Sequence, residues 1–262
     1  MGTPFAQLAM YPMPHLEAAY DLFWRRLVDG LAAEGVEGAP SSLAWDRDLH
    51  EAWHDPDAFV TKTCGWPLIT VLREKVAVIG SFEVVAPFAS GGRYRSVIVS
   101  SKPLSVAEWK QRGDCRLVAN NPDSLSGWVS LSWAWGERLD DLRFVGAHVE
   151  SIREIVEGRA DLASIDAVTF EHVITSQPSV AARVHVVGHG PEVPSLPLVC
   201  ANRFADNVPA FRRVLASLTA PESLSRDRDL ADALGTLKIK GFVPFGIEAF
   251  EFLPGLLPPP VG

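Results

Sequence analysis

GAHVESIREIVEGRADLASIDAVTFEH, residues 146–172, switches between two kinds of sequence pattern. VESIREIVEG predicts a helix that Gly158 closes, and ADLASID predicts a strand that ends at Asp166. AVTFEH then begins a second helix, and LRFVG predicts a strand ahead of the first one. Strands that alternate with helices in this way are typical of α/β architecture with mostly parallel sheets.

The same alternation extends outward through the chain. Strand patterns cover residues 5–11, 58–65, 76–84, 94–101, 115–120, 183–188 and 196–202. Helical patterns cover residues 15–35, 123–139, 207–219 and 227–237. No internal repeat accompanies them. The sequence therefore predicts an α/β fold throughout.

The composition is that of an ordinary globular protein. The 262 residues suit one large domain or two lobes of about 100–150 residues each. Apolar residues make up 47% and charged residues 21%, which excludes a disordered chain. The formal net charge is −8 and the basic residues are dispersed, which excludes the electrostatic footprint of a nucleic-acid-binding protein.

Cysteines and apolar runs bear on the cellular setting. Cys64, Cys115 and Cys200 form no CxxC pair, so reduced thiols are expected, with one disulfide plus a free thiol as the alternative. No apolar run reaches the roughly 18 residues that a membrane span needs, and the N-terminal residues lack a signal-peptide pattern. The chain as written is expected in the cytoplasm, or in the periplasm if an export signal precedes it.

Small polar residues open the predicted helix in NNPDSLSGW, residues 120–128. Asn121 or Asp123 can cap this helix, and Ser124, Ser126 and Gly127 lie in its first turn. Backbone N–H groups at a helix start, together with hydroxyls and a glycine that permits close approach, can hold a polar ligand group. The alternative is that these residues only satisfy the backbone of the helix.

Two further polar elbows follow predicted strands. GAHVES places His148 and Ser151 where a strand ends and a helix begins, and Asp166 ends the next strand. In open α/β sheets, ligands bind outside the carboxyl ends of the strands. The three clusters are therefore expected to converge on one cleft, although a structural histidine and a capping aspartate would each explain one elbow alone.

Three segments carry a resemblance to a known family. NNPDSLSGW, GAHVESIREIVEGRADLASIDAVTFE and LGTLKIKGFVP, in this order, resemble the phosphonate/phosphite-type substrate-binding proteins of ABC importers. The resemblance covers roughly residues 60–250. It implies a two-lobed type II periplasmic-binding-protein fold, in which hinge closure traps a ligand between lobes that are each a mostly parallel sheet flanked by helices.

The resemblance also implies lobe boundaries and ligand contacts. Residues 1–98 plus 200–262 would form lobe 1 and residues 99–199 lobe 2, with two hinge crossings near VIVSSK and LPLVCAN. The implied ligand contacts are Tyr11, Cys64, Gly65 and Trp66 in lobe 1, and Ser124, Ser126, Gly127, His148 and Asp166 in lobe 2. Asn121, Asp123 and Ser151 of the same elbows are further candidate contacts, from their positions at the helix starts.

The charges of the three elbows bear on the ligand. Asp123, Glu150 and Asp166 are acidic, and the elbows contain no Arg or Lys. Two like charges 4 Å apart repel by about 4 kcal/mol at an effective dielectric constant of about 20. A neutral, zwitterionic or cationic ligand therefore fits these residues better than a phosphonate dianion, with aromatic walls from Tyr11, Trp66 or Trp128.

HEAWH, His50 to His54, matches the H-E-x-x-H pattern of zinc peptidases. Asp55–Pro56 stops the helix directly after the second histidine, so a short surface helix is expected instead of a zinc site. A nucleophilic pair of Cys64 with His148 is a second alternative, although a cysteine beside a turn glycine more often only packs. Neither a dinucleotide fingerprint nor a P-loop occurs.

The sequence therefore predicts a non-enzymatic, two-lobed binding protein of the ABC-transporter type for a small polar organic or phosphonate-like ligand. No cofactor, metal, nucleic acid or membrane insertion is expected, and an ABC permease is the expected protein partner. The alternative is a cytosolic enzyme of cofactor-precursor metabolism on the same fold, because fold does not fix function. The sequence names neither the ligand nor the oligomeric state.

Overall fold

The computed structural model describes residues 2–10 and 13–260. The chain forms two compact units. Unit 1 comprises Met1–Val85, Ser90–Arg93 and Pro194–Glu251; unit 2 comprises Ala86–Ala89, Tyr94–Val193 and the segment that starts at Phe252. The main changes of unit thus fall after residues 93 and 193, whereas the sequence predicted them after residues 98 and 199.

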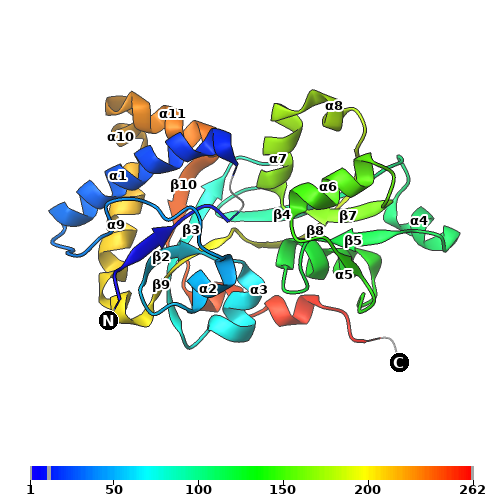
Figure 1. Ribbon diagram of the computed structural model, residues 1–262, viewed down its shortest axis with the longest axis horizontal. Helices are drawn as coiled ribbons and strands as arrows, with labels where there is room; N and C mark the ends of the chain where they lie inside the picture. Colours follow the sequence, from blue (N-terminus) through cyan, green and yellow to red (C-terminus); the bar gives the residue numbers. More distant parts are fainter. Residues whose placement is uncertain (1, 11–12, 261–262) are drawn as a thin grey trace. The chain divides into compact units, whose positions relative to one another are not determined.

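Unit 1 is a five-stranded sheet with helices on both faces (Figure 1). The strand order is β1-β2-β9-β3-β10. Its strands are β1 (Phe5–Gln7), β2 (Ala58–Lys62), β3 (Val76–Val84), β9 (Pro197–Ala201) and β10 (Ile239–Val243). Its helices are α1 (Glu17–Ala33), α2 (Leu49–His54), α3 (Gly65–Pro67), a π-helix (Leu68–Leu72), α9 (Val208–Leu218), α10 (Pro221–Arg226) and α11 (Arg228–Thr236), with short 3-10 turns at Pro14–Leu16, Asn202–Asn207 and Ile247–Phe250.

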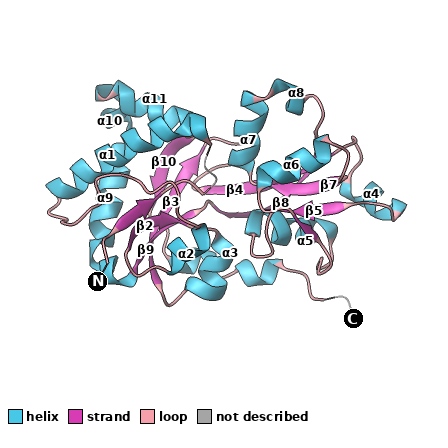
Figure 2. Cartoon of the chain, viewed as in Figure 1, coloured by secondary structure: helices cyan, strands magenta, loops and turns pink. Residues whose placement is uncertain are grey.

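Unit 2 is built in the same way around a second five-stranded sheet (Figure 2). The strand order is β6-β5-β7-β4-β8. Its strands are β4 (Arg93–Ser100), β5 (Leu117–Ala119), β6 (Arg143–Phe144), β7 (Leu162–Ile165) and β8 (His185–Pro194). Its helices are α4 (Val106–Arg112), a π-helix (Leu125–Val129), α5 (Ser130–Trp135), α6 (His148–Val156), α7 (Ala167–Ser176) and α8 (Pro178–Ala181), with a 3-10 turn at Leu253–Leu256.

Both sheets are mixed, so the prediction of mostly parallel sheets is wrong in this detail. In unit 1, β1 pairs in parallel with β2, whereas β2–β9, β3–β9 and β3–β10 are antiparallel. In unit 2, β5 is parallel to β6 and to β7, and β4 is antiparallel to β7. Parallel neighbours need a crossover connection, which α1 supplies between β1 and β2. In unit 1, the later strands β9 and β10 pair antiparallel instead.

The pairing of β1 with β2 contains a bulge. Phe5 is opposite Ala58, but Ala6 is opposite Val60, so Phe59 is an extra residue in β2. A bulge changes which face of the sheet the following side chains occupy. Beyond it, Thr61 lies opposite Gln7.

Aromatic residues fill the core of unit 1 between the sheet and the helices α1, α9 and α11. Phe23, Trp24, Phe59 and Phe211 are each no more than 1% exposed. Trp24 and Phe59 meet edge to face at 6.4 Å between ring centroids, and Phe59 lies 5.2 Å from Phe211. These rings explain why the 15–35 pattern folds as a helix against this sheet, because their burial removes a large apolar area from water.

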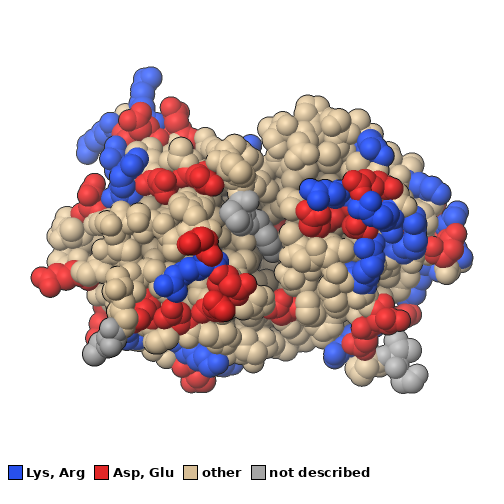
Figure 3. Space-filling view, viewed as in Figure 1, with Lys and Arg blue, Asp and Glu red and all other residues tan. Residues whose placement is uncertain are grey.

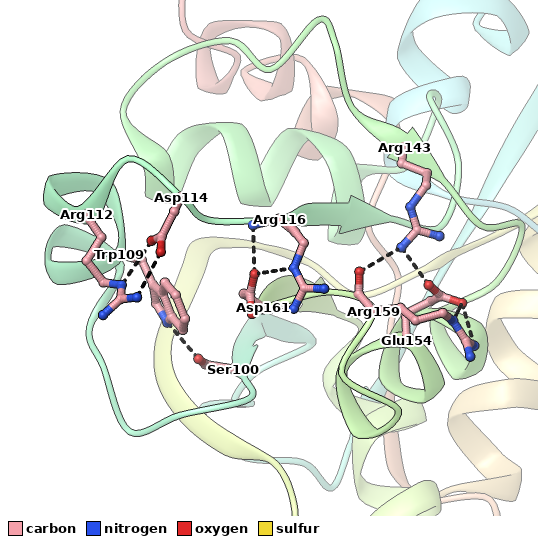
Figure 4. A network of polar contacts seen from close by, with 9 residues as sticks. All are labelled: Ser100, Trp109, Arg112, Asp114, Arg116, Arg143, Glu154, Arg159 and Asp161. Atoms are coloured by element: carbon pink, nitrogen blue, oxygen red, sulfur yellow. Dashed lines mark hydrogen bonds and ion pairs between the residues drawn. The ribbon is translucent and has the colours of Figure 1, made fainter.

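Ion pairs tie the strands of unit 2 to its helix α6 (Figure 4). Glu154 of α6 accepts hydrogen bonds from Arg143 of β6 at 2.6 Å and from Arg159 at 2.9 Å. These bonds lower the pKa of the Glu154 carboxyl to about 2. Asp161 likewise accepts two hydrogen bonds from the Arg116 guanidinium, at 2.8 and 2.9 Å. The network holds the β5–β6–β7 region and α6 in one arrangement.

Candidate functional site

The polar elbows of unit 2 lie at one edge of its sheet. β5 runs parallel to both β6 and β7, so the carboxyl ends of these three strands share an edge. The loop that carries Ser124 follows β5, His148 starts α6 after β6, and Asp166 precedes α7 after β7. The structure therefore places the three elbows at one edge of this sheet.

A hydrogen bond joins the first elbow to the second. Ser126 Oγ lies 2.8 Å from Nε2 of His148, and Ser164 of β7 donates to the Ser126 carbonyl at 2.6 Å. His148 is 0% exposed, and its burial lowers its pKa to about 4 although the nearby Asp166 carboxylate acts in the opposite direction. At neutral pH the imidazole is therefore uncharged.

Ser124, and neither Asn121 nor Asp123, caps the helix of the first elbow. The Ser124 hydroxyl accepts a hydrogen bond from the Gly127 N–H at 3.0 Å. The helix begins as a π-helix at Leu125, two residues after the start of the 123–139 pattern. The Ser124 side chain thus satisfies the helix backbone, which is the alternative that the sequence left open.

Gly127 is required by its neighbours. A Cβ atom at this position would lie 1.9 Å from Oδ1 of the buried Asn120 and 3.1 Å from the Ser124 hydroxyl. No side chain larger than hydrogen fits there unless Asn120 moves. The glycine therefore lets the helix start close onto the end of β5.

Asp166 caps α7 with one carboxylate oxygen. Its Oδ1 accepts from the Thr169 N–H at 2.8 Å. Oδ2 is buried and has no hydrogen-bond partner among the residues that the structure describes. The side chain is 2% exposed. A buried carboxylate oxygen without a partner is costly, and it marks a position where a donor from another molecule would be stabilising.

The other predicted contacts of unit 2 have structural partners. Asn121 donates to the Gly146 carbonyl at 3.2 Å, which links the first two elbows. The Ser151 hydroxyl, within α6, donates to the Ala147 carbonyl at 3.3 Å. Asp123 is partly exposed. The Trp128 indole N–H donates to the Leu139 carbonyl at 2.8 Å.

The predicted contacts of unit 1 start the helix after β2. Cys64 is the N-cap of α3, and Gly65 and Trp66 are its first residues. Cys64 is 6% exposed and Trp66 is partly buried. Tyr11 lies outside the described residues.

The HEAWH segment forms a short surface helix, as predicted. α2 ends at His54, and both of its histidines are exposed. Nδ1 of His54 lies 3.2 Å from the Lys75 ammonium, and the His50 ring packs against Trp53. In the described part of the chain, no group of three or more His, Cys, Asp or Glu side chains is arranged to hold a metal.

Sequence reasoning missed two residues that build the site. Asn120 and Ser164 are both 0% exposed, at the end of β5 and within β7. Ser164 orients the Ser126 backbone, and Asn120 packs against Gly127. The available signal was a polar residue inside or directly after an apolar strand, because such residues are buried only with partners.

Acidic and basic side chains are interspersed on the face of both units shown in Figure 3. Within the described residues, no helix combines the length and apolar character needed to cross a membrane.

Comparison with known families and structures gives a consistent result. Residues 76–249 match the family of ABC-transporter periplasmic substrate-binding proteins for phosphonate. No curated protein matches the chain.

Three solved structures share the fold. PhnD1 from Prochlorococcus marinus MIT 9301, in complex with methylphosphonate, has a TM-score of 0.75 and 15% identity, with 97% of each chain covered. A binding-protein component of an ABC phosphonate transporter from Pseudomonas aeruginosa has a TM-score of 0.72 and 14% identity, covering 97% of this chain and 86% of that one. A Xanthomonas citri protein bound to ATP has a TM-score of 0.65 and 13% identity, covering 97% and 96%. These similarities confirm the predicted periplasmic-binding-protein fold.

Proposed function

Because the chain belongs to the family of periplasmic substrate-binding proteins of phosphonate ABC transporters, we propose that it binds a small polar ligand at the strand ends of unit 2 and delivers it to a permease. The Ser126–His148 pair and Asp166 are the proposed core of the site. Asn121, Asp123, Ser124, Gly127 and Ser151 complete the proposed set by shaping the elbows or lining their edge.

The observation that carries this proposal is the second oxygen of Asp166. It is buried, lacks a partner among the described residues, and lies at the edge where the other elbows end. An ionised carboxylate can accept hydrogen bonds but cannot donate them. The ligand is therefore proposed to present a donor, either an ammonium or a hydroxyl group, to Asp166.

The charges around the elbows support the same ligand class. Asp166 is acidic, and the His148 imidazole is neutral at physiological pH because its pKa is lowered to about 4. Asp123 adds a partly exposed carboxylate at the same helix start. A ligand with an ammonium group or neutral hydrogen-bond donors avoids the repulsion that Asp166 and Asp123 would exert on a dianion.

The alternative of an enzyme has one observation in its favour, because a serine hydroxyl 2.8 Å from a histidine is the geometry of a nucleophile and its base. Two features oppose it. A general base works best with a pKa near the working pH, and the pKa of His148 is about 4. Ser126 and His148 are also 2% and 0% exposed, so the pair is a binding and scaffolding element in this proposal.

Three residues of unit 1 are proposed as ligand contacts in their own right. Cys64, Gly65 and Trp66 follow the carboxyl end of β2, which is the edge of an α/β sheet where ligands bind. Tyr11 remains a predicted contact from the same unit.

The test is ligand screening with matched variants. The panel, read by thermal shift and then by calorimetry, contains methylphosphonate, 2-aminoethylphosphonate, amino acids, betaines and vitamin precursors. A ligand at a hundred times its Kd adds about 2.7 kcal/mol to the free energy of unfolding. Asp166→Asn keeps a side-chain oxygen for the Thr169 cap and replaces the other acceptor by a donor.

Asp166→Asn is expected to weaken binding of the best ligand about 10- to 100-fold. Asp48→Asn is the control, because Asp48 caps α2 in the same way on the surface of unit 1. Equal affinities of the wild type and Asp166→Asn would refute the site. Turnover of ester substrates that is lost in Ser126→Ala would favour the enzyme instead.

A further inference from the structure

Lys62 is the last residue of β2, at the carboxyl end of the parallel β1–β2 pair. The bulge at Phe59 sets its direction. Val60 pairs with Ala6 and belongs to the core on the α1 side of the sheet. Since side chains alternate along a strand, Lys62 lies on the same side as Val60.

The surroundings of the Lys62 ammonium agree with this direction. Nζ lies 5.7 Å from the ring centroid of Tyr20, which is in the first turns of α1, and 5.4 Å from the ring of Phe82. The carbonyl of Lys62 accepts from the Trp53 indole at 3.0 Å, so the backbone at the strand end is held in place. The side chain is partly buried.

The ammonium has no polar partner among the described residues. Within that part of the chain, the ammonium lies near two aromatic rings, and neither a carboxylate nor another hydrogen-bond acceptor pairs with it. An ammonium has three N–H donors, which ring faces attract but do not satisfy in the way that an oxygen acceptor does. The chain has a net charge of −8, so acidic side chains outnumber basic ones, and yet none of the described ones pairs with Lys62.

Other lysines of the chain show the usual arrangement. Lys110 pairs with Glu137 at 2.7 Å, and Lys240 pairs with Glu83 at 3.1 Å. Lys102 lies over the ring of Trp109 at 5.6 Å, but it follows β4, which is antiparallel to β7, so it is at the opposite edge of the unit 2 sheet from the elbows. Lys62 differs from Lys102 in its position. Its ammonium also lies near aromatic rings, but it ends β2 at the carboxyl edge of the parallel β1–β2 pair, where α/β sheets bind ligands.

We propose that Lys62 binds an oxyanion group of the ligand, a carboxylate or a phosphonate, and thereby determines the charge specificity of unit 1. The inference rests on the proposed function, in which the chain binds a small polar ligand. Lys62 is assigned to unit 1 alone, and the variant at Asp166 tests unit 2 separately. The rings of Tyr20 and Phe82 lie near the ammonium and leave its three N–H donors available to an oxyanion.

The experiment separates the two groups of the ligand. The probes are 2-aminoethylphosphonate, its carboxylate analogue 3-aminopropanoate, ethylphosphonate without the amine, and ethylamine without the anion. Binding of each probe is measured by calorimetry for the wild type, Lys62→Gln, Lys62→Arg and Asp166→Asn. Lys102→Gln is the matched control, since it also removes a ring-packed lysine.

Lys62→Gln is expected to weaken the anionic probes about 10- to 100-fold, with Lys62→Arg retaining most of the affinity. Ethylamine binding should be unchanged in Lys62→Gln, and Lys102→Gln should bind every probe as the wild type does. The preferred anion, phosphonate or carboxylate, follows from the first two probes. Thermal unfolding of Lys62→Gln checks that unit 1 is still folded.

Two results would overturn the inference. One is that Lys62→Gln binds the anionic probes as well as the wild type while Asp166→Asn does not, which leaves the proposed function standing. The other is that the wild type binds the amine and none of the three anions. If Asp166→Asn binds every probe as the wild type does, the proposed site in unit 2 is refuted. The proposal for Lys62 is then still decided by the affinities of Lys62→Gln for the anionic probes.

Discussion

Ser126 Oγ and His148 Nε2, 2.8 Å apart, join the π-helix after β5 to the first residue of α6. The bond lies in the interior of unit 2, and it links two elbows that are separated by 22 positions in the chain. A neutral imidazole at the start of a helix can exchange this bond for one to a ligand without a change in its own charge. Protonation of His148 would disturb both the bond and the packing.

The pH dependence of stability should reveal His148. Its folded-state pKa, about 4, is below its ordinary value of 6.5, so the unfolded chain binds the proton first. The stability contribution of the neutral buried form is present above pH 6.5 and is lost as the pH falls toward 4, by up to about 1.4 kcal/mol per pH unit. We expect His148→Gln to flatten the free energy of unfolding between pH 6.5 and 4, measured by urea titration. The same slope in both proteins would contradict this assignment.

Glu154 should dominate a lower pH window. Hydrogen bonds from Arg159 and Arg143 depress the pKa of its carboxyl to about 2 from an ordinary value of 4.5. The stabilisation is therefore present above pH 4.5 and is lost as the pH falls toward 2. Glu154→Gln should remove this part of the acid dependence in urea titrations. Glu150→Gln, which breaks an exposed pair with Arg153, should behave as the wild type does.

Gly127→Ala should destabilise unit 2. The added Cβ would lie 1.9 Å from Asn120 Oδ1, so the helix start or the end of β5 must shift. Overpacking of this kind costs about 1–3 kcal/mol, measured as a lower urea midpoint, and ligand affinity should fall as well. In the control Gly235→Ala, no atom lies within 4 Å of the new Cβ, and an alanine in α11 should be neutral or stabilise by about 0.5–1 kcal/mol. A Gly127→Ala variant as stable as this control would show that Asn120 moves freely.

The thiol of Cys200 should resist alkylation in the native protein. Burial raises its pKa to about 12, so the reactive thiolate is scarce at pH 8. Burial and the nearby Asp161 carboxylate raise the pKa of Cys115 to about 12 as well. Mass spectrometry after iodoacetamide treatment should find both thiols modified only after unfolding in urea. Rapid native modification of Cys200 would mean that β9 opens readily.

The sequence predicted most helices and strands because their patterns are long and regular. The apolar period of residues 15–35 gave α1, and the β-branched run of residues 94–101 gave β4. The helix α4 was not predicted, and the 123–139 pattern predicted a helix without indicating that it starts as a π-helix at Leu125–Val129. A π-turn depends on the contact of Gly127 with Asn120 and Ser124, which is a tertiary relation that local periodicity does not encode.

The elbows of the candidate site were predictable from the sequence. Strand-then-helix patterns placed His148 and Asp166 at strand ends, and the structure places these ends at one sheet edge of unit 2. The roles of individual atoms did not follow, because Ser124 and not Asp123 caps the helix. Lys62 escaped notice for the same reason, since a bulge rather than a residue pattern sets its face.

The extra residue at Phe59 is absorbed between two paired stretches of β2, with Ala58 opposite Phe5 and Thr61 opposite Gln7. Beyond it, Thr61 and Lys62 also pair with Val199 and Leu198 of β9. Loss of one residue at the bulge would therefore restore the regular pairing and leave Thr61 and Lys62 on the faces that they occupy now, because both keep their partners. A change of chain length at this point is thus compatible with the same cation at the end of β2.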